Sequence, residues 1–320
     1  MERKYVLTNE TIEVNGRTLH RIKAIRDFGG VRKGALGGWI EKESNLSHEG
    51  SCWIKDTVFV YGNAEIYENA YIRSCTIYDN VKIHGNAEIC GDHESKIYGN
   101  TEIYGYVKIH ESFEIYGDVK IYDNVKIISG YDDAVIRIYG SAEIYENAQI
   151  SEYVEIYDDA KVYGNTIIFG ETKIYGNAKV YGNTVITDII KIYGNAEIYD
   201  NAELCGAIEV YDNAKIYGHA NISGTVKIYG NAEVYDNANI NCSVRIYDNA
   251  KIYGNAEVYG GVELYYKETG TVYFGLKDYN IIKIYGNAEV YDNAFLQGDM
   301  EIYDDTKIYG NTKLIKHYKN

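Results

Sequence analysis

Proline is absent from this chain of 320 residues, and methionine, tryptophan and cysteine are rare. Because proline cannot donate the backbone hydrogen bond that an internal strand requires, its absence is typical of a chain built almost wholly from internal strands. The five cysteines are odd in number and scattered, which argues against a disulfide framework and indicates reduced thiols. These absences favour a regular β protein that does not depend on covalent cross-links.

Long apolar runs and an excess of positive charge are also lacking. No apolar run approaches the ~20 residues that a helix needs to cross a bilayer. The opening residues contain no secretory hydrophobic region. The formal net charge of -15 disfavours nucleic acid and anionic membranes as partners. We therefore expect a cytoplasmic protein that binds neither nucleic acid nor membrane.

The chain does contain a repeat of eighteen residues. From Phe59 onward, thirteen blocks can be superimposed, each made of three six-residue units such as KIYGNA, EVYDNA and a less regular third unit. The second residue of every unit is Ile, Val or Leu, and strand alternation places it on the same side as the small residue four positions later. The Gly-Asn or Asp-Asn pair that follows tolerates the positive φ of a tight corner. Each unit is predicted to be a short strand followed by a corner.

Three units make one triangular coil, and successive coils stack at the parallel-strand spacing of about 4.8 Å. The residue before the aliphatic one in the second unit alternates between Glu and Lys from Glu65 to Lys307, and only Lys161 followed by Lys179 breaks the alternation. Opposite charges on neighbouring strands are stabilising, whereas a twelve-residue coil would stack lysine on lysine. The period of eighteen is therefore favoured.

The predicted fold is an all-β, triangular parallel β-solenoid of about 13–14 coils, formed by residues 39–320 with an insertion at 263–282. Residues 1–38 lie outside the repeat, and their Asn15-Gly16 pair is a strong hairpin signal. We expect them to form an N-terminal β-hairpin cap. The inward positions predict that Ile174, Ile192 and Ile228 are fully buried.

The units resemble those of the bacterial hexapeptide-repeat family. IYGNAK and VYDNAE match that family's pattern at the aliphatic and small positions, although tyrosine stands where the family usually has Gly, Ala, Glu or Asp. Residues 25–54, with DF, GGWI, NLS and CWI, are similar to the YdcK-like β-solenoid proteins, some of which carry acyltransferase names. The resemblance implies a left-handed coil, and it implies acyl transfer from an acyl-CoA donor as one possible activity.

Tyrosine follows the aliphatic residue in all thirteen first units and in twelve of the thirteen second units, the exception being His84. These side chains are expected to point outward and to form two aromatic ladders. The favoured interpretation is structural, because stacked rings shield the hydrogen-bond ladder of the sheet. The alternative is a long surface that binds sugar or protein.

The third units break this regularity. Three insertions fall in or just after them, at residues 91–95, 129–135 and 264–280. Insertions grouped at one corner of a solenoid often mark its binding face. The longest can pair as a hairpin and is rich in aromatic side chains, which are typical contact anchors. We predict that the binding residues include Tyr265, Tyr266, Tyr273, Phe274, Tyr279 and Tyr131.

A small group of sulfur and imidazole side chains is a weak candidate for a metal site. Cys90 and His110 are predicted to occupy the same outward position in successive coils, with His93 in the loop between them. Because a closed structural site needs four well-placed ligands, the pattern favours no metal and no cofactor. His84 and His110 are weak candidates for the general base of an acyl transfer, since neither shows a recognisable partner carboxylate in the sequence.

The sequence thus favours a rigid, non-catalytic scaffold or binding protein over an enzyme. It would present its third corner and inserted loops to a protein or glycan partner, as a monomer or a low-order homo-oligomer. The alternative is a divergent hexapeptide-repeat acyltransferase that uses an acyl-CoA donor. A histidine in a cleft between subunits would favour the enzyme, and a solvated third corner would favour the scaffold.

Overall fold

A computed structural model describes residues 2–130, 134–260, 263–266, 272–275 and 281–316, with the backbone alone at 263–266 and 272–275. The chain divides into two compact units, Met1–Asn165 and Thr166–Asn320. Each is a stack of parallel β-coils, and the one helical segment among the described residues is the 3-10 turn η1 (Glu43–Asn45). In this described part of the chain, no helix is long and apolar enough to cross a membrane.

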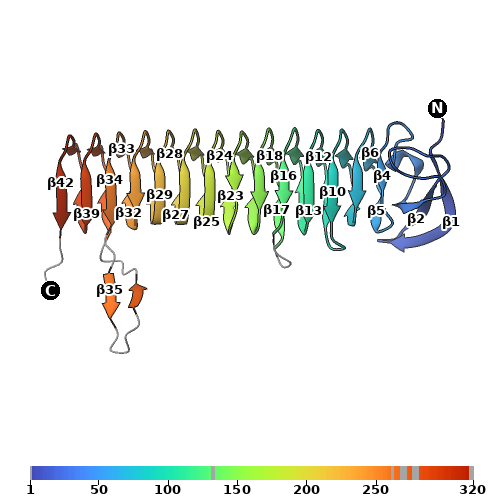
Figure 1. The fold of residues 1–320 in the computed structure, drawn as a ribbon, viewed down its shortest axis with the longest axis horizontal. Helices are drawn as coiled ribbons and strands as arrows, with labels where there is room; N and C mark the ends of the chain where they lie inside the picture. Colours follow the sequence, from blue (N-terminus) through green and yellow to red (C-terminus); the bar gives the residue numbers. More distant parts are fainter. Residues whose placement is uncertain (1, 131–133, 261–262, 267–271, 276–280, 317–320) are drawn as a thin grey trace. The chain divides into compact units, whose positions relative to one another are not determined.

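The first unit opens with the predicted hairpin (Figure 1). Strands β1 (Tyr5–Val14) and β2 (Arg17–Ala24) pair antiparallel around Asn15 and Gly16, which have φ of 50° and 74°. Strand β2 also pairs antiparallel with β3 (Leu36–Ile40), and β3 pairs parallel with β5 (Val58–Val60) of the coils. The hairpin is therefore joined to the coils through the edge of β3.

The coils of the first unit have three faces, each a column of short parallel strands. The first face contains β5 (Val58–Val60), β8 (Cys75–Ile77), β11 (Lys96–Gly99), β14 (Phe113–Gly117), β17 (Ile136–Ile138) and β20 (Val154–Ile156). The second face contains β6 (Glu65–Ile66), β9 (Lys82–Ile83), β12 (Glu102–Ile103), β15 (Lys120–Ile121), β18 (Glu143–Ile144) and β21 (Lys161–Val162). The third face contains β4 (Trp53–Ile54), β7 (Tyr71–Arg73), β10 (Glu88–Gly91), β13 (Lys108–Glu111), β16 (Lys126–Ile128) and β19 (Gln149–Ser151).

The second unit repeats this plan. Its third and first faces contain β22 (Ile167–Ile168), β23 (Thr172–Ile174), β31 (Asn239–Asn241), β32 (Ser243–Ile246), β34 (Glu257–Gly260), β37 (Ile282–Ile284), β39 (Phe295–Gly298), β40 (Met300–Ile302) and β42 (Lys313–Lys316). Three longer strands run from the third face through the corner into the first face: β25 (Val185–Ile192), β27 (Glu203–Val210) and β29 (Asn221–Ile228). Its second face contains β24 (Lys179–Val180), β26 (Glu197–Ile198), β28 (Lys215–Ile216), β30 (Glu233–Val234), β33 (Lys251–Ile252), β38 (Glu289–Val290) and β41 (Lys307–Ile308). We call the turn from a first to a second face the first corner, and the turn from a second to a third face the second corner. The turn from a third face to the next first face is the third corner.

The register between coils confirms the period of eighteen. Lys179 lies opposite Glu197, and their side chains form an ion pair of 3.0 Å. Lys251 lies opposite Glu289 and forms an ion pair of 3.2 Å with Glu233 of the preceding coil. The predicted core positions are also confirmed, because Ile174, Ile192 and Ile228 are all 0% exposed.

The corners explain why an aspartate is often followed by a glycine in the next coil. At Gly194, whose φ is 69°, an added Cβ would lie 2.9 Å from the backbone nitrogen of Asp212 in the next coil. Asp212 also has positive φ, and its carboxylate accepts a hydrogen bond of 3.1 Å from the amide of Gly230. An aspartate therefore packs against a glycine in the following coil, where there is no side chain to meet it.

The outward tyrosines form the expected ladders in each unit. In the second unit, Tyr193 and Tyr211 have ring centroids 4.9 Å apart and planes 4° apart, and the other rings of the column repeat this arrangement. In the first unit His84 takes a ring position between Tyr67 and Tyr104. Because each ring covers the face of its neighbour, the ladders offer a partner ring edges rather than ring faces. This supports the structural interpretation of the ladders.

Replacing Ile192 with Asp tests the core. The side chain is 0% exposed, so Ile192→Asp places an unpaired charge inside the coil and should lower the free energy of unfolding by several kcal/mol. Ile189→Asp is the matched control, because Ile189 lies on the same strand but is 53% exposed. Thermal unfolding of both variants measures the difference. Equal melting temperatures for Ile192→Asp and the parent would show that the assigned inward positions are wrong.

The tyrosine ladders predict a steep loss of stability in alkali. Burial, followed by nearby negative charges and neighbouring tyrosines, raises the pKa of Tyr145, Tyr193 and Tyr247 to about 12. An exposed tyrosine in the unfolded chain has a pKa of about 10, so between these values the folded state binds more protons. The ladder contribution to stability is thus complete below pH ~10 and decreases as the pH rises through the folded pKa.

We expect tyrosinate absorbance and loss of the β circular dichroism signal to appear together, in one transition above pH ~10. The two signals are recorded on the same samples across the pH range. Tyrosines that ionise with a pKa near 10 while the β signal stays intact would contradict the stacked arrangement.

Candidate functional site

The third corner departs from the period of eighteen. Tyr78 and Tyr98 stack in adjacent coils although they are 20 residues apart, and Tyr116 and Tyr139 stack although they are 23 apart. In the second unit, Tyr247 and Tyr285 stack across a separation of 38 residues. In each case the extra residues leave from the third corner and the chain returns in register, as the sequence predicted.

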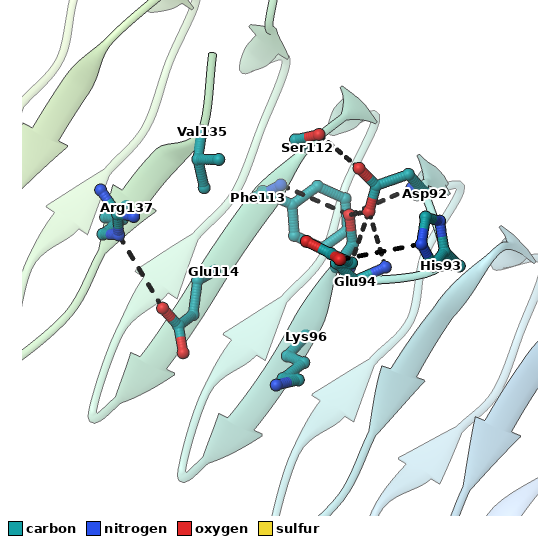
Figure 2. A pocket seen from close by; sticks show the side chains of 10 residues that line it. Asp92, His93, Glu94, Lys96, Ser112, Phe113, Glu114, Val135 and Arg137 are labelled. Carbon is teal, nitrogen blue, oxygen red and sulfur yellow. Dashed lines mark hydrogen bonds and ion pairs between the residues drawn. The ribbon is translucent and has the colours of Figure 1, made fainter. Parts of the chain in front are cut away.

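A pocket of about 400 Å³ lies beside the loop of the first insertion in the first unit (Figure 2). The loop of the first insertion forms one wall with Asp92, His93 and Glu94, and Ser95 also lines the pocket. Val135, at the end of the second insertion, lies on the opposite side. The coil between them has no insertion, and its residues Ser112, Phe113 and Glu114 complete the lining on this side.

The floor and rim of the pocket come from the intervening coils. Ser112 and Phe113 form the floor, and Phe113 is only 2% exposed. Lys96, Glu114 and Arg137 lie opposite one another on β11, β14 and β17 and form the rim. The guanidinium of Arg137 is 3.9 Å from the Glu114 carboxylate. The pocket is therefore lined mainly by polar and charged side chains, and its rim carries charges of both signs.

Asp92 fixes the loop of the first insertion. Its carboxylate accepts hydrogen bonds from the Ser112 hydroxyl, from the Ser95 hydroxyl at 2.8 Å and from the Glu94 amide at 2.9 Å. Burial alone would raise the pKa of Asp92, but these hydrogen bonds outweigh it and hold the pKa below its usual range. Asp92 is consequently a structural anion that holds the wall of the pocket, and it is poorly suited to act as a general base.

The structure brings two of the three candidate metal ligands together and leaves the third apart. Cys90 and His110 occupy opposing positions on β10 and β13, as predicted. His93 does not join them: its side chain is 90% exposed and lies 3.8 Å from Glu94. Glu88 stands in its place, because the potential ligand atoms of Glu88, Cys90 and His110 all lie within 4.8 Å of one another. The sequence analysis missed Glu88, although a residue two positions before Cys90 must share its side of the strand.

His84 has carboxylate neighbours that were not recognised in the sequence, although its Nε2 has no hydrogen-bond partner among the described residues. Its Nε2 is 3.6 Å from Glu102 and its Nδ1 is 3.8 Å from Glu68, in the coils on either side. Both faces of the imidazole are covered, with ring centroids 4.5 Å from Tyr67 and 5.0 Å from Tyr104. His84 is not among the residues that line the third-corner pocket. This geometry is that of a ladder ring, not of a base that faces a substrate.

The predicted aromatic binding residues are only partly described. Strands β35 (Glu263–Tyr266) and β36 (Val272–Gly275) form an antiparallel pair in which Tyr265 lies opposite Tyr273 and Leu264 opposite Phe274. They form a two-stranded sheet of their own. Tyr279 and Tyr131 lie outside the described residues. A binding role for these aromatic residues stays a prediction.

No known protein-family profile matches the chain. A stretch of 55 residues is 46% identical to a protein named "Uncharacterized acetyltransferase YdcK" from Escherichia coli (strain K12). The match covers 17% of this chain and 17% of that protein. Together with the stacked coils of about eighteen residues, it fits the resemblance to hexapeptide-repeat proteins and to YdcK in particular.

Proposed function

We propose that this protein is a rigid, non-catalytic scaffold that presents its third corner to a protein or glycan partner. The observation that carries the proposal is the pocket of about 400 Å³ beside the loop of the first insertion. Ligands usually bind in concave sites where a few polar groups converge. Loops inserted at one corner of a repeat architecture commonly form its binding face.

Other parts of the coil support this assignment, because their side chains are engaged in contacts between neighbouring coils. On the second face, lysine and glutamate side chains pair between coils, as in Lys161 with Glu143 at 3.1 Å. At the first corner, asparagine side chains bond along the stack, as in Asn195 to Asn213 at 3.0 Å. Side chains that already satisfy one another have little left to offer a specific partner.

The rim of the pocket favours a partner with polar groups of both signs. Lys96 is exposed, and Arg137 and Glu114 are each about 40% exposed. Arg137 lies 3.9 Å from Glu114 and 3.7 Å from Glu155, and Glu114 also accepts a hydrogen bond of 3.1 Å from the Tyr98 hydroxyl. Glu94, with 83% of its side chain exposed, adds a further carboxylate at the wall. Exposed charges of this kind set the orientation and specificity of a contact more than its affinity.

Acyl transfer is the second candidate, and the partial similarity to a protein named as an acetyltransferase favours it. Its weakness concerns the two histidines that the sequence offered as the base. His84 is enclosed between two rings, and His110 belongs to the cluster with Glu88 and Cys90. A general base must reach the proton that it abstracts in a plausible substrate pose.

The two candidates differ in an acyl-transfer assay. Purified protein incubated with acetyl-CoA and a panel of amino-sugar and hydroxyl acceptors should release no free thiol above the background without protein. The thiol is followed continuously with a chromogenic disulfide reagent. Turnover that disappears in His84→Ala or His110→Ala would overturn the scaffold proposal in favour of the enzyme.

The scaffold proposal also predicts which changes weaken partner binding. The double variant His93→Ala/Glu94→Ala removes two exposed side chains from the pocket wall and should reduce affinity for the captured partner at least tenfold. Deletion of residues 263–282 restores a coil of eighteen residues, so it should leave the melting temperature nearly unchanged while weakening capture. Tyr106→Ala is the control, because Tyr106 is 65% exposed and lies outside the third corner.

The partner is captured from the native host, identified, and then titrated against each purified variant. Undiminished affinity in both the wall variant and the deletion would rule out the third corner as the binding face. An unfolded deletion variant would show that the long insertion is structural, and the wall variant would then decide the question alone.

A further inference from the structure

A cluster of three different ligand types lies on the outer side of the third face in the first unit. Glu88 and Cys90 are two residues apart on β10, so both side chains lie on the same side of that strand. His110 lies opposite Cys90 on the neighbouring strand β13. The carboxylate, thiol and imidazole ligand atoms all lie within 4.8 Å of one another. The backbone register alone brings these groups together.

The imidazole of His110 has an unexplained feature. Its Nε2 atom is buried and has no hydrogen-bond partner within the described structure. A buried polar atom without a partner is costly and rare, and an unseen ion is one recognised explanation. Cys90 beside it is only 8% exposed. The imidazole and the thiol therefore lie close together, and the thiol is almost completely buried.

The charges around the cluster are compatible with a cation. Glu88 is 3.4 Å from the ammonium of Lys108, whose side chain is 52% exposed and can turn toward water when the carboxylate is engaged elsewhere. Arg73 and Ile128 occupy the matching positions in the coils on either side of the Cys90 and His110 pair. Arg73 is exposed, so its positive charge is partly screened by solvent.

We propose that Glu88, Cys90 and His110 bind a divalent metal ion of borderline softness, of the Zn²⁺ class. Carboxylate, thiolate and neutral imidazole are all established zinc ligands, and three protein ligands with one open position are typical of reactive rather than purely structural sites. The thiol releases its proton to solvent on binding, so the two negative ligands balance the charge of the ion. Metal–ligand bonds of 2.0–2.3 Å require the ligand atoms to approach by roughly 1 Å, and rotation of the half-exposed Glu88 supplies much of this.

The site would not be needed for folding. Hydrogen bonds between neighbouring coils already fix Cys90 opposite His110, whereas zinc-dependent domains gain their structure from the metal. We therefore expect metal binding to leave the circular dichroism spectrum unchanged. This separates the site from a structural zinc finger and makes binding, rather than folding, the quantity to measure.

Cobalt titration of the reduced, metal-free protein tests the proposal. One equivalent of Co²⁺ should produce a thiolate-to-metal charge-transfer band, which one equivalent of Zn²⁺ should abolish by displacement. Cys90→Ser should remove the band, and His110→Ala or Glu88→Gln should weaken binding at least tenfold. His93→Ala and Cys205→Ser are matched controls, an exposed histidine of the adjacent loop and an exposed thiol elsewhere, and should behave like the parent.

A second measurement needs no substitution at the site. Alkylation of each cysteine is followed by mass spectrometry with and without Zn²⁺, and Zn²⁺ should slow the modification of Cys90 at least tenfold while leaving Cys205 unaffected. No charge-transfer band with the parent protein, or a band that survives Cys90→Ser but is lost in Cys205→Ser, would overturn the proposal. Equal alkylation of Cys90 with and without Zn²⁺ would also overturn it.

Discussion

The structure depends on one constraint: each coil must return to the same register with its neighbour, most often after eighteen residues. Backbone amides of one coil donate to carbonyls of the next, as Tyr193 does to Val210 at 2.9 Å and Asn195 to Asp212 at 2.6 Å. A shift of one residue would break these bonds and turn the aliphatic side chains outward together. The tight corners enforce the same register. A side chain at Gly194 would not fit, because its Cβ would lie 2.9 Å from the backbone nitrogen of Asp212 in the next coil.

This constraint separates the structural parts of the coil from the part that is free to vary. The first and second corners use nearly uniform glycine or aspartate turns. The third corner also has positive φ at many coils but accepts different residues there, including Ser74, Glu111, Asp188 and Cys242. Chain that leaves at this corner returns in register, so loops are added without disturbing the core. The pocket lies at this corner, and the cluster of Glu88, Cys90 and His110 lies on the adjoining third face, where neighbouring coils differ from one another.

The fold was predictable because it follows from the period alone. The inward position of Ile192 and the pairing of Lys179 with Glu197 follow from counting eighteen residues. The site was less predictable because it depends on side chains from different coils. Glu102 is eighteen residues after His84, so its proximity could have been counted. The bond between Asp92 and Ser112 spans 20 residues because of an insertion, and no repeat rule fixes how that loop folds back to line a pocket.

Disulfide trapping tests the register most directly. Asn195 and Asn213 lie eighteen residues apart with their side chains hydrogen-bonded at 3.0 Å. Neighbouring parallel strands are about 4.8 Å apart, within the range of about 4.4–6.8 Å between Cα atoms that a disulfide can bridge. In a Cys205→Ser background, cysteines at positions 195 and 213 should cross-link fully under mild oxidation, while cysteines at 195 and 207 should not. Cross-linking of the second pair and not of the first would contradict the eighteen-residue coil on which the whole account rests.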